Sequence, residues 1–340
     1  MSRALSEPAG TGRLTIRDLV RSDAPPSFAE DVRAGLTAES KRLFPKYFYD
    51  ELGSVLFDAI CLLPEYYLTR AENEVLTRYA DEIVSEAGGR DVSLIEMGSG
   101  SALKTRIIIE ALLKRQPELL FIPVDISASA IETSSRVLLQ SYPKLRISAY
   151  AGDYYDGLAA LAEENRGATL ALFLGSNIGN FDAGEARAFL KAMRRVLREG
   201  DALLLGADLR KPAPILEAAY DDALGVTAAF NLNLLSRINR EFDANFDIRS
   251  FRHRVAYNQD IGRVEVYIES LRNQTVAIRR LELEIHFEEG ERIHTENSYK
   301  YDLEGLSQLA TATGFERRRT WLDSREQFSS SLFVAVGASD

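Results

Sequence analysis

Residues 94–102 read Leu-Ile-Glu-Met-Gly-Ser-Gly-Ser-Ala, an apolar run that ends in a glycine turn. Residues 92–97 predict a buried strand, and residues 104–114 predict the helix that follows the turn. Glycine lets the backbone approach a ligand closely, and the first N–H groups of a helix are free to bind one. The sequence therefore predicts a ligand-binding strand, turn and helix here.

The same alternation of strand and helix continues along the chain. We expect further strands at residues 119–125, 145–153, 168–175 and 202–209, and further helices at 127–139 and 183–197. In the first of these helices, Ser129 and Glu132 have the spacing of a capping box. The alternation predicts an α/β fold, in which helices cover both faces of a parallel sheet.

From about residue 210 the pattern changes. A helical stretch at 213–238 precedes four segments with alternating apolar and polar residues, which predict an antiparallel sheet with one wet face: 249–257, 262–270, 274–278 and 281–287. A helix at 302–314 and strands at 316–322 and 330–337 then return to the first pattern. We therefore expect a flexible N-terminal arm (1–26), a discontinuous core (27–72, 92–209 and 300–340) and a separate second lobe (73–91 and 210–299), the lobe to which the resemblance described below gives the binding of the substrate.

The composition is that of an ordinary globular chain, with 340 residues of which 46% are hydrophobic and 27% charged. The net charge of −10 repels phosphate backbones and anionic membrane surfaces, so we expect neither nucleic acid nor a membrane as partner. The single cysteine, Cys61, excludes an internal disulfide, and three histidines are too few for a clustered metal site. We expect a cytoplasmic protein without metal, a monomer rather than a dimer.

Three carboxylates stand at predicted strand ends: Glu96, two residues before Gly98, then Asp125 and Asp153. In a doubly wound sheet these ends converge on one crevice. They suit a ligand with an amino group, ribose hydroxyls and a positive charge, a description that S-adenosylmethionine fits. Leu103 occupies the place of the third glycine in the dinucleotide fingerprint, so a nicotinamide-dependent oxidoreductase is disfavoured.

Other candidate residues have two interpretations each. Lys104 suits either the carboxylate of a cofactor or a helix surface. Asn180 follows the fourth strand, where an amide can orient a substrate amine, but Asn177 and Asn180 also suit a plain turn. The aromatic residues within 47–50 and 63–67 suit either core packing or a lid over the site.

Six segments of the chain resemble the ergothioneine-pathway L-histidine Nα-methyltransferases: residues 47–72, 94–105, 121–127, 173–180, 218–235 and 290–301. The resemblance extends over nearly everything after about residue 30. It implies a class I methyltransferase core that carries an inserted substrate-binding lobe. It further implies three successive methyl transfers from S-adenosylmethionine to the α-amino group of histidine, with hercynine as product.

The resemblance also implies a role for individual residues in binding the cofactor. Asp125 would bind the ribose hydroxyls, and Asp153 would lie near the adenine. Together with the carboxylates and the glycine turn, the predicted cofactor site comprises Glu96, Gly98, Ser99, Gly100, Lys104, Asp125, Asp153, Tyr154 and Gly175.

For the amino acid, the resemblance implies that Tyr66, Asn180 and Tyr220 hold the amino and carboxylate groups. Tyr49 would lie near the amine, and Glu296 with Ser298 would form hydrogen bonds to the imidazole. The predicted catalytic residues are Tyr49, Tyr66 and Asn180; the predicted substrate-binding residues are Tyr66, Asn180, Tyr220, Val266, Glu296, Asn297 and Ser298.

One departure from the family concerns Val266, which stands where family members have a methionine beside the imidazole. A smaller side chain enlarges the pocket and keeps open a methyltransferase for tryptophan or another amine. Glu296 favours histidine, because a buried carboxylate without an N–H partner is costly. A third alternative, a non-catalytic protein that binds S-adenosylmethionine, would bind the cofactor without turnover.

Overall fold

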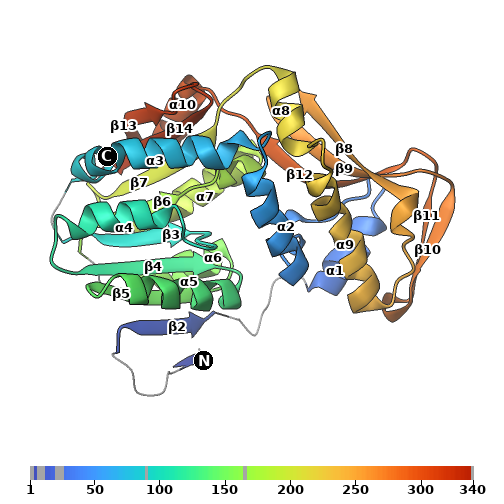
Figure 1. Cartoon of the computed structure of the whole chain (residues 1–340), viewed down its shortest axis with the longest axis horizontal. Helices are drawn as coiled ribbons and strands as arrows, with labels where there is room; N and C mark the ends of the chain where they lie inside the picture. Colours follow the sequence, from blue (N-terminus) through green and yellow to red (C-terminus); the bar gives the residue numbers. More distant parts are fainter. Residues whose placement is uncertain (1–3, 6–11, 20–26, 89–90, 164–166, 338–340) are drawn as a thin grey trace. The chain divides into compact units, whose positions relative to one another are not determined.

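The computed structural model describes residues 4–5, 12–19, 27–88, 91–163 and 167–337 (Figure 1). The chain divides into two compact units. Unit 1 comprises Met1–Ser22, Arg70–Leu209 and Tyr301–Asp340, and unit 2 comprises Asp23–Thr69 and Arg210–Lys300. Each unit has its own strands and its own buried apolar side chains, so each is described by itself.

Unit 1 is built on a nine-stranded sheet in the order β1-β2-β5-β4-β3-β6-β7-β14-β13. Strands β2, β5, β4, β3, β6 and β7 run parallel, and β14 and β13 close one edge antiparallel. The strands are β1 (Ala4–Leu5), β2 (Leu14–Asp18), β3 (Ser93–Met97), β4 (Leu119–Asp125), β5 (Leu145–Ala151), β6 (Thr169–Phe173), β7 (Ala202–Asp208), β13 (Phe315–Leu322) and β14 (Phe328–Ala335). Parallel strands therefore form the centre of this sheet, which confirms the predicted α/β fold class.

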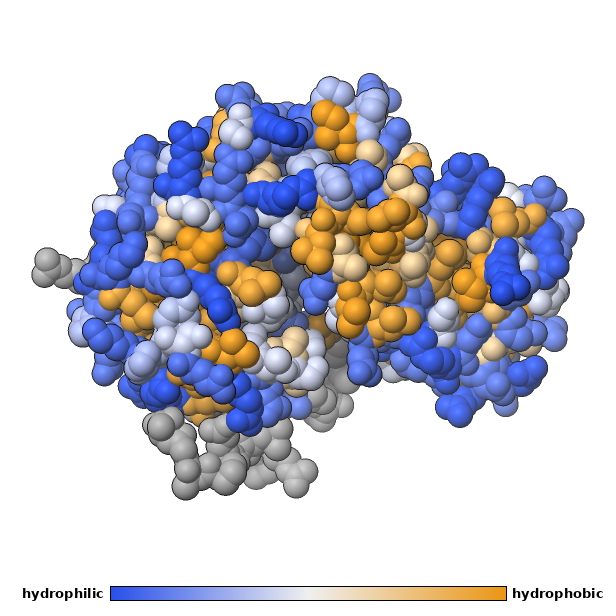
Figure 2. All heavy atoms as spheres, in the orientation of Figure 1, coloured by the Kyte–Doolittle hydropathy of each residue, from blue (hydrophilic) through white to orange (hydrophobic). Residues whose placement is uncertain are grey.

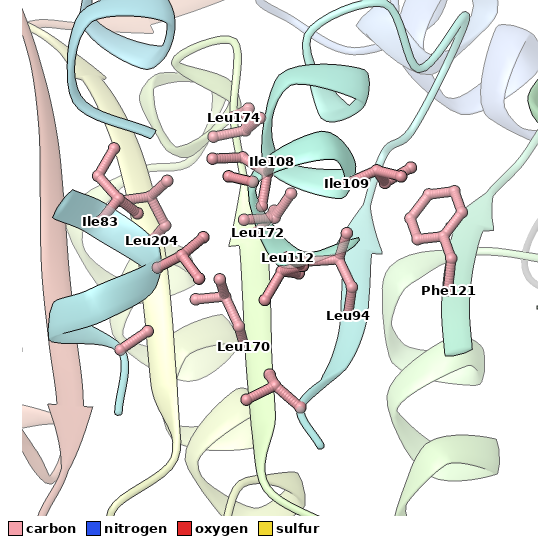
Figure 3. Close-up of a cluster of buried hydrophobic side chains, with 14 of the residues drawn as sticks. Ile83, Leu94, Ile108, Ile109, Leu112, Phe121, Leu170, Leu172, Leu174 and Leu204 are labelled. Carbon is pink, nitrogen blue, oxygen red and sulfur yellow. The ribbon is translucent and has the colours of Figure 1, made fainter. Parts of the chain in front are cut away.

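The central strand β3 is buried along its whole length, and its side chains alternate between two apolar cores. Leu94 packs in one core with Ile108 and Leu112 of helix α4 (Thr105–Leu113; Figure 3). Ile95 packs in the other core with Phe189 of helix α7 (Ala183–Val196). Helices therefore cover both faces of the sheet, as the strand and helix alternation predicts.

The helices of unit 1 are α3 (Tyr67–Glu86), α4 (Thr105–Leu113), α5 (Ala128–Ser141), α6 (Tyr154–Ala162), η2 (Asn177–Asn180), α7 (Ala183–Val196) and α10 (Leu303–Ala312). The predicted capping box of α5 is wrong. Its N-cap is Ser127, whose hydroxyl accepts from the Ala130 amide, while Glu132 forms an ion pair with Arg136 one turn on. The helix therefore begins at Ala128, two residues earlier than a cap at Ser129 would place its start.

Unit 2 packs helices against antiparallel strands. Its elements are α1 (Phe28–Leu36), η1 (Pro45–Tyr47), α2 (Glu51–Leu62), α8 (Ala213–Tyr220), α9 (Val226–Phe242), η3 (Ile248–Ser250), β8 (Phe251–Asn258), β9 (Arg263–Ser270), β10 (Gln274–Ile278), η4 (Arg279–Leu281), β11 (Leu283–Phe287) and β12 (Arg292–Tyr299). The strands form a three-stranded sheet, β12-β9-β8, and a hairpin, β10-β11. The expected antiparallel arrangement is present, but β12 was not predicted because polar residues such as His294, Glu296 and Asn297 interrupt its apolar pattern.

The N-terminal assignments need correction. Residues 27–69 were expected in the core but belong to unit 2, because Leu36, Phe48 and Ile60 pack with Phe230 of α9. Residues 73–91 were expected in the lobe but belong to unit 1, where Val75, Leu76 and Ile83 of α3 join the core beside β3.

The predicted flexible arm is also wrong in part. Leu14–Asp18 form β2, which pairs in parallel with β5, and Leu14 and Ile16 pack against the core. The remainder of this prediction falls mostly on residues 1–3, 6–11 and 20–26, which lie outside the described residues.

Helix α2 carries apolar side chains on its exposed side. Leu52, Val55 and Leu62 are all exposed, and Figure 2 shows hydrophobic atoms gathered over this helix. Among the described residues, no single helix is long and apolar enough to cross a membrane, although α2 and α3 pass that test together as a bent pair.

Candidate active site

The glycine turn after β3 adopts the conformation that only glycine tolerates well, with φ of +75° at Gly98 and +47° at Gly100. A Cβ atom on Gly98 would lie 2.9 Å from the Tyr154 hydroxyl and 3.2 Å from the Asn177 amide nitrogen. The Gly100 amide donates to Asp125 over 2.9 Å. The ends of β3, β4 and β6 therefore meet at this turn, as predicted for converging strand ends.

Glu96 is buried directly beneath the turn. The Thr105 hydroxyl donates to its carboxylate over 2.6 Å, and burial raises the pKa of Glu96 to about 8. Ser99 stands in the turn itself, and its buried hydroxyl has no hydrogen-bond partner within the described residues. A polar ligand at the turn would satisfy this group.

A second buried carboxylate, Glu72 of α3, connects two predicted cofactor residues. It forms an ion pair with Lys104 and accepts the Gly175 amide over 2.9 Å at each carboxylate oxygen. Glu72 is fully buried, and a Cβ on Gly206 would lie only 2.1 Å from it. Glu72 was not predicted as a site residue, because within a helical pattern it is indistinguishable from a surface acid.

The remaining predicted residues of unit 1 lie around the same strand ends. Asp153 caps α6 by accepting the Asp156 amide over 2.8 Å, which leaves its other carboxylate oxygen outside this bond. The Tyr154 ring packs edge-on against Phe173, with 5.5 Å between ring centroids. Asn180 ends η2 with an exposed side chain.

These features fit S-adenosylmethionine. The turn allows close approach to backbone, Ser99 offers an unsatisfied hydroxyl, and Asp125 and Asp153 supply carboxylates for hydroxyl and amino groups. Among the described residues, no group of three or more His, Cys, Asp or Glu is placed to hold a metal ion.

Unit 2 gathers the predicted tyrosines in an aromatic cluster. The Tyr49 ring contacts Phe57 and Phe230, and the Tyr66 ring lies 6.2 Å from those of Phe57 and Tyr220. Burial raises the pKa of Tyr66 well above its ordinary value, and the neighbouring Tyr220 raises it further. The phenol of Tyr66 is therefore neutral at physiological pH, a hydrogen-bond donor as well as an acceptor.

His253 positions one of these tyrosines. Its Nδ1 atom lies 2.9 Å from the side-chain amide nitrogen of Asn231, so it accepts, and its Nε2 atom donates to the Tyr220 carbonyl over 2.7 Å. Burial lowers the pKa of His253, which favours this neutral form. The histidine is a packing residue that fixes the end of α8 beside β8.

Strand β12 separates the predicted substrate residues into two faces. Glu296 pairs directly with Val266 and Ser298 with Val264, so Glu296, Ser298 and Val266 share one face of the sheet. Asn297 points to the opposite face, where its side-chain oxygen lies 2.8 Å from His294. The structure thus brings Glu296, Ser298 and Val266 together and leaves Asn297 apart.

The carboxylate of Glu296 accepts no hydrogen bond from any described residue. Burial raises its pKa to about 7, and the positive charge of Lys300 lowers the pKa in part. Ser298 and Tyr220 are joined by a hydrogen bond of 2.8 Å, and the Lys300 ammonium group donates to both. The sequence analysis missed Lys300, since a lysine at the end of a polar segment is usually exposed.

A surface hollow of 610 Å³ lies elsewhere in unit 2, on the β10–β11 hairpin. It is lined by Asn273, Gln274, Thr275, His286, Phe287, Glu288 and Glu291. None of the predicted site residues lines it, and the chemistry described above lies outside it.

Comparison with known proteins assigns the chain to a family. Residues 28–335 match the family model of histidine-specific, S-adenosylmethionine-dependent methyltransferases. The chain belongs to this family. It is therefore an N-methyltransferase that uses S-adenosylmethionine as methyl donor, and the resemblance drawn from its motifs is confirmed.

Three relatives illustrate the range of substrates among similar proteins. A histidine N-alpha-methyltransferase of Mycolicibacterium smegmatis is 41% identical over 93% of this chain and 97% of its own. An ergothioneine biosynthesis protein 1 of Schizosaccharomyces pombe is 31% identical over 67% of this chain and 30% of its own. An L-tryptophan methyltransferase of Psilocybe serbica is 27% identical over 85% of this chain and 87% of its own.

The Glu72 contacts predict a role in cofactor binding. Replacing Glu72→Gln removes the charge that holds Lys104, and we expect the dissociation constant for S-adenosylmethionine to rise about tenfold in calorimetric titration. Glu82→Gln is the matched control, because Glu82 lies on the same helix but pairs with Arg319 at the surface. Equal affinities for the two variants would remove Glu72 from this role.

Proposed function

We propose that the chain transfers three methyl groups from S-adenosylmethionine to the α-amino group of L-histidine. The product would be Nα,Nα,Nα-trimethyl-L-histidine (hercynine), an intermediate of ergothioneine biosynthesis. Membership of the histidine-specific family supports this proposal, as does the relative of M. smegmatis. The observation that carries it is the Glu296 carboxylate, which faces Val266 beside Ser298 and accepts no hydrogen bond from the described residues.

The imidazole ring of histidine can form one hydrogen bond with each of the two polar side chains on this face of β12. Glu296 would accept a hydrogen bond from the N–H of the imidazole, which gives this half-buried carboxylate a donor. Ser298 meets the second ring nitrogen. A side chain without an N–H group would leave Glu296 without a donor, so the site rejects aliphatic amino acids and phenylalanine.

The tyrosines would hold the amino acid's other end. Tyr66 and Tyr220, with rings 6.2 Å apart, would offer their hydroxyl groups to the carboxylate and amino groups. Tyr49 lies in the same aromatic cluster and is half-exposed, so it is placed to meet the amine. The side-chain oxygen of Asn180, on η2 of unit 1, is proposed to accept a hydrogen bond from an N–H of the amine.

When bound, S-adenosylmethionine supplies an electrophilic methyl carbon on a sulfonium. Asp125 and Asp153 would bind its hydroxyls and adenine, and Lys104 its carboxylate. The protein's own task is to hold a neutral amine with its lone pair aimed at that carbon, so orientation and polar contacts supply the rate enhancement. Because the α-ammonium form has no lone pair, the rate should rise as the pH becomes alkaline.

The proposal is tested by incubating the protein with S-adenosylmethionine and an equimolar mixture of amino acids, followed by mass spectrometry. We expect a gain of three methyl groups on histidine alone. Methylation of a different amino acid would keep the cofactor site but overturn the assignment of Glu296. Binding of S-adenosylmethionine without any methylated product would overturn the catalytic proposal.

Methylation of tryptophan is the second candidate, favoured by Val266, which is smaller than the methionine of family members. Glu296 and Ser298 oppose it, because an indole ring has one N–H and no acceptor nitrogen.

The cytoplasmic location and monomeric state expected from the sequence stay proposals. Analytical sedimentation of the purified protein measures directly whether it is a monomer.

Replacing Glu296→Ala removes the acceptor for the ring N–H. A hydrogen bond to a charged group contributes about 1.5–3 kcal/mol, so we expect the KM for histidine to rise about 10- to 100-fold in steady-state assays. In the wild-type protein the carboxylate form of Glu296 dominates above its pKa of about 7, so the KM should fall as pH rises through that value. Glu284→Ala, at an exposed position of β11, should leave the KM unchanged.

Replacing Tyr49→Phe keeps the ring but removes the hydroxyl proposed to contact the amine. As methyl groups replace N–H bonds, each transfer depends on the remaining polar contacts, so we expect partly methylated histidine to accumulate. Mass spectrometry of a time course measures the ratio of mono-, di- and trimethylated product. An unaltered ratio would exclude Tyr49 from orienting the amine.

A further inference from the structure

No role has been assigned to Lys300 so far. It follows β12, and its side chain is buried with only 3% exposed. Its ammonium group donates to the Tyr220 hydroxyl over 2.9 Å and to the Ser298 hydroxyl over 2.8 Å, and it lies 4.7 Å from the centre of the Tyr220 ring. Burying a lysine costs free energy unless its charge is compensated, so a buried lysine at this position suggests a functional role.

The ammonium group decides which way the hydroxyl of Ser298 points its proton. An ammonium group only donates, so it occupies one lone pair on the Ser298 oxygen. The phenol of Tyr220 is the stronger acid of the two hydroxyls, so it donates across the 2.8 Å hydrogen bond to Ser298. With both lone pairs occupied, the Ser298 hydroxyl can act toward a ligand only as a donor.

Glu296 has the opposite polarity on the same face. It lies two residues before Ser298 on β12, which separates the two along the strand by roughly 6.7 Å. As a carboxylate it only accepts. The face therefore presents one acceptor and one donor at a spacing that a single five-membered ring can bridge.

We propose that Lys300 is a specificity-determining, positioning residue: by fixing Ser298 as a donor, it makes the site select a neutral imidazole. A neutral imidazole has one N–H for Glu296 and one unprotonated nitrogen for Ser298. An imidazolium has two donors and a positive charge beside Lys300. An indole has no acceptor nitrogen, so it too would leave Ser298 unsatisfied. The inference rests on the proposed function.

Other ionisable groups surround the cluster and enter any pH dependence. The pKa of Tyr66 is raised by burial and by its neighbours Tyr220, Cys61, Tyr49 and Glu296. His253 of β8 contacts the Tyr220 backbone and is influenced by Asp221 and Asp222. Arg210 lies against Gly262, whose carbonyl accepts the Lys300 amide. A test must therefore cancel the titration of the protein itself.

A ratio of two substrates achieves this cancellation. The probe is 1,2,4-triazolyl-alanine, whose ring has a donor and acceptors like imidazole but stays neutral at pH 6. We measure kcat/KM for histidine divided by that for the probe, at pH 8 and pH 6. With an imidazole pKa of about 6.5, selection of the neutral ring makes this ratio fall about fourfold in the wild-type protein.

In Lys300→Met the positive charge is gone and Ser298 is free to accept. We expect kcat/KM at pH 8 to fall for both substrates, through KM more than kcat, and the ratio to change less than twofold between the two pH values. A merely structural lysine would lower both substrates equally and keep the fourfold fall. Lys41→Met is the matched control, because Lys41 is a largely buried lysine paired with Glu291 in the same unit; it should keep the fourfold fall.

If Lys300→Met does not fold, Ser298→Ala provides a second test, in which Lys300 keeps its charge and its hydrogen bond to Tyr220. It removes the obligatory donor but not the charge, so the ratio should fall by clearly less than fourfold. A fourfold fall in every variant that folds would overturn the inference while leaving the proposed function intact. Absence of histidine methylation by the wild-type protein would instead overturn the proposed function.

Discussion

A carboxylate removed from water must be matched by donors or a positive charge, or else it takes up a proton. Three glutamates show three outcomes of this constraint. Glu72 is compensated by Lys104 and the Gly175 amide. Glu96 has one donor, Thr105, and its pKa rises to about 8. Glu296 has no donor among the described residues, and its pKa rises to about 7. Only Glu296 has no hydrogen-bond donor among the described residues, and this difference supports the proposal that its face of β12 binds the substrate.

The same reasoning connects stability to specificity. Glu72 fixes Lys104 and the turn after β6 from within the core, so unit 1 presents its strand ends in a set arrangement. In unit 2 the positive charge of Lys300 serves two groups, since it favours the charged form of Glu296 and fixes the donor direction of Ser298. A buried charge is thereby used to define which ring the site accepts rather than to stabilise the fold.

Much of this could be predicted from the sequence, because strand, glycine turn and helix around Glu96 and Gly98 are local features. The converging acids at Asp125 and Asp153 follow from the rules of parallel sheets. The segment at residues 28–62 was assigned to the wrong unit, since an apolar pattern predicts a buried helix face but not which sheet that face packs against. Glu72 and Lys300 were missed for a related reason: their burial depends on residues far away in sequence. Asn297 was grouped with Glu296 and Ser298, although the period of a strand places it on the other face.

The central claim is that Glu296 and Ser298 bind the two nitrogens of a neutral imidazole. A crystal structure with histidine and S-adenosylhomocysteine tests it most directly. The account predicts a ring nitrogen within about 3 Å of a Glu296 carboxylate oxygen and the other within about 3 Å of the Ser298 hydroxyl. A complex in which the amino acid's carboxylate or α-amine occupies this face of β12, with the imidazole elsewhere, would contradict it.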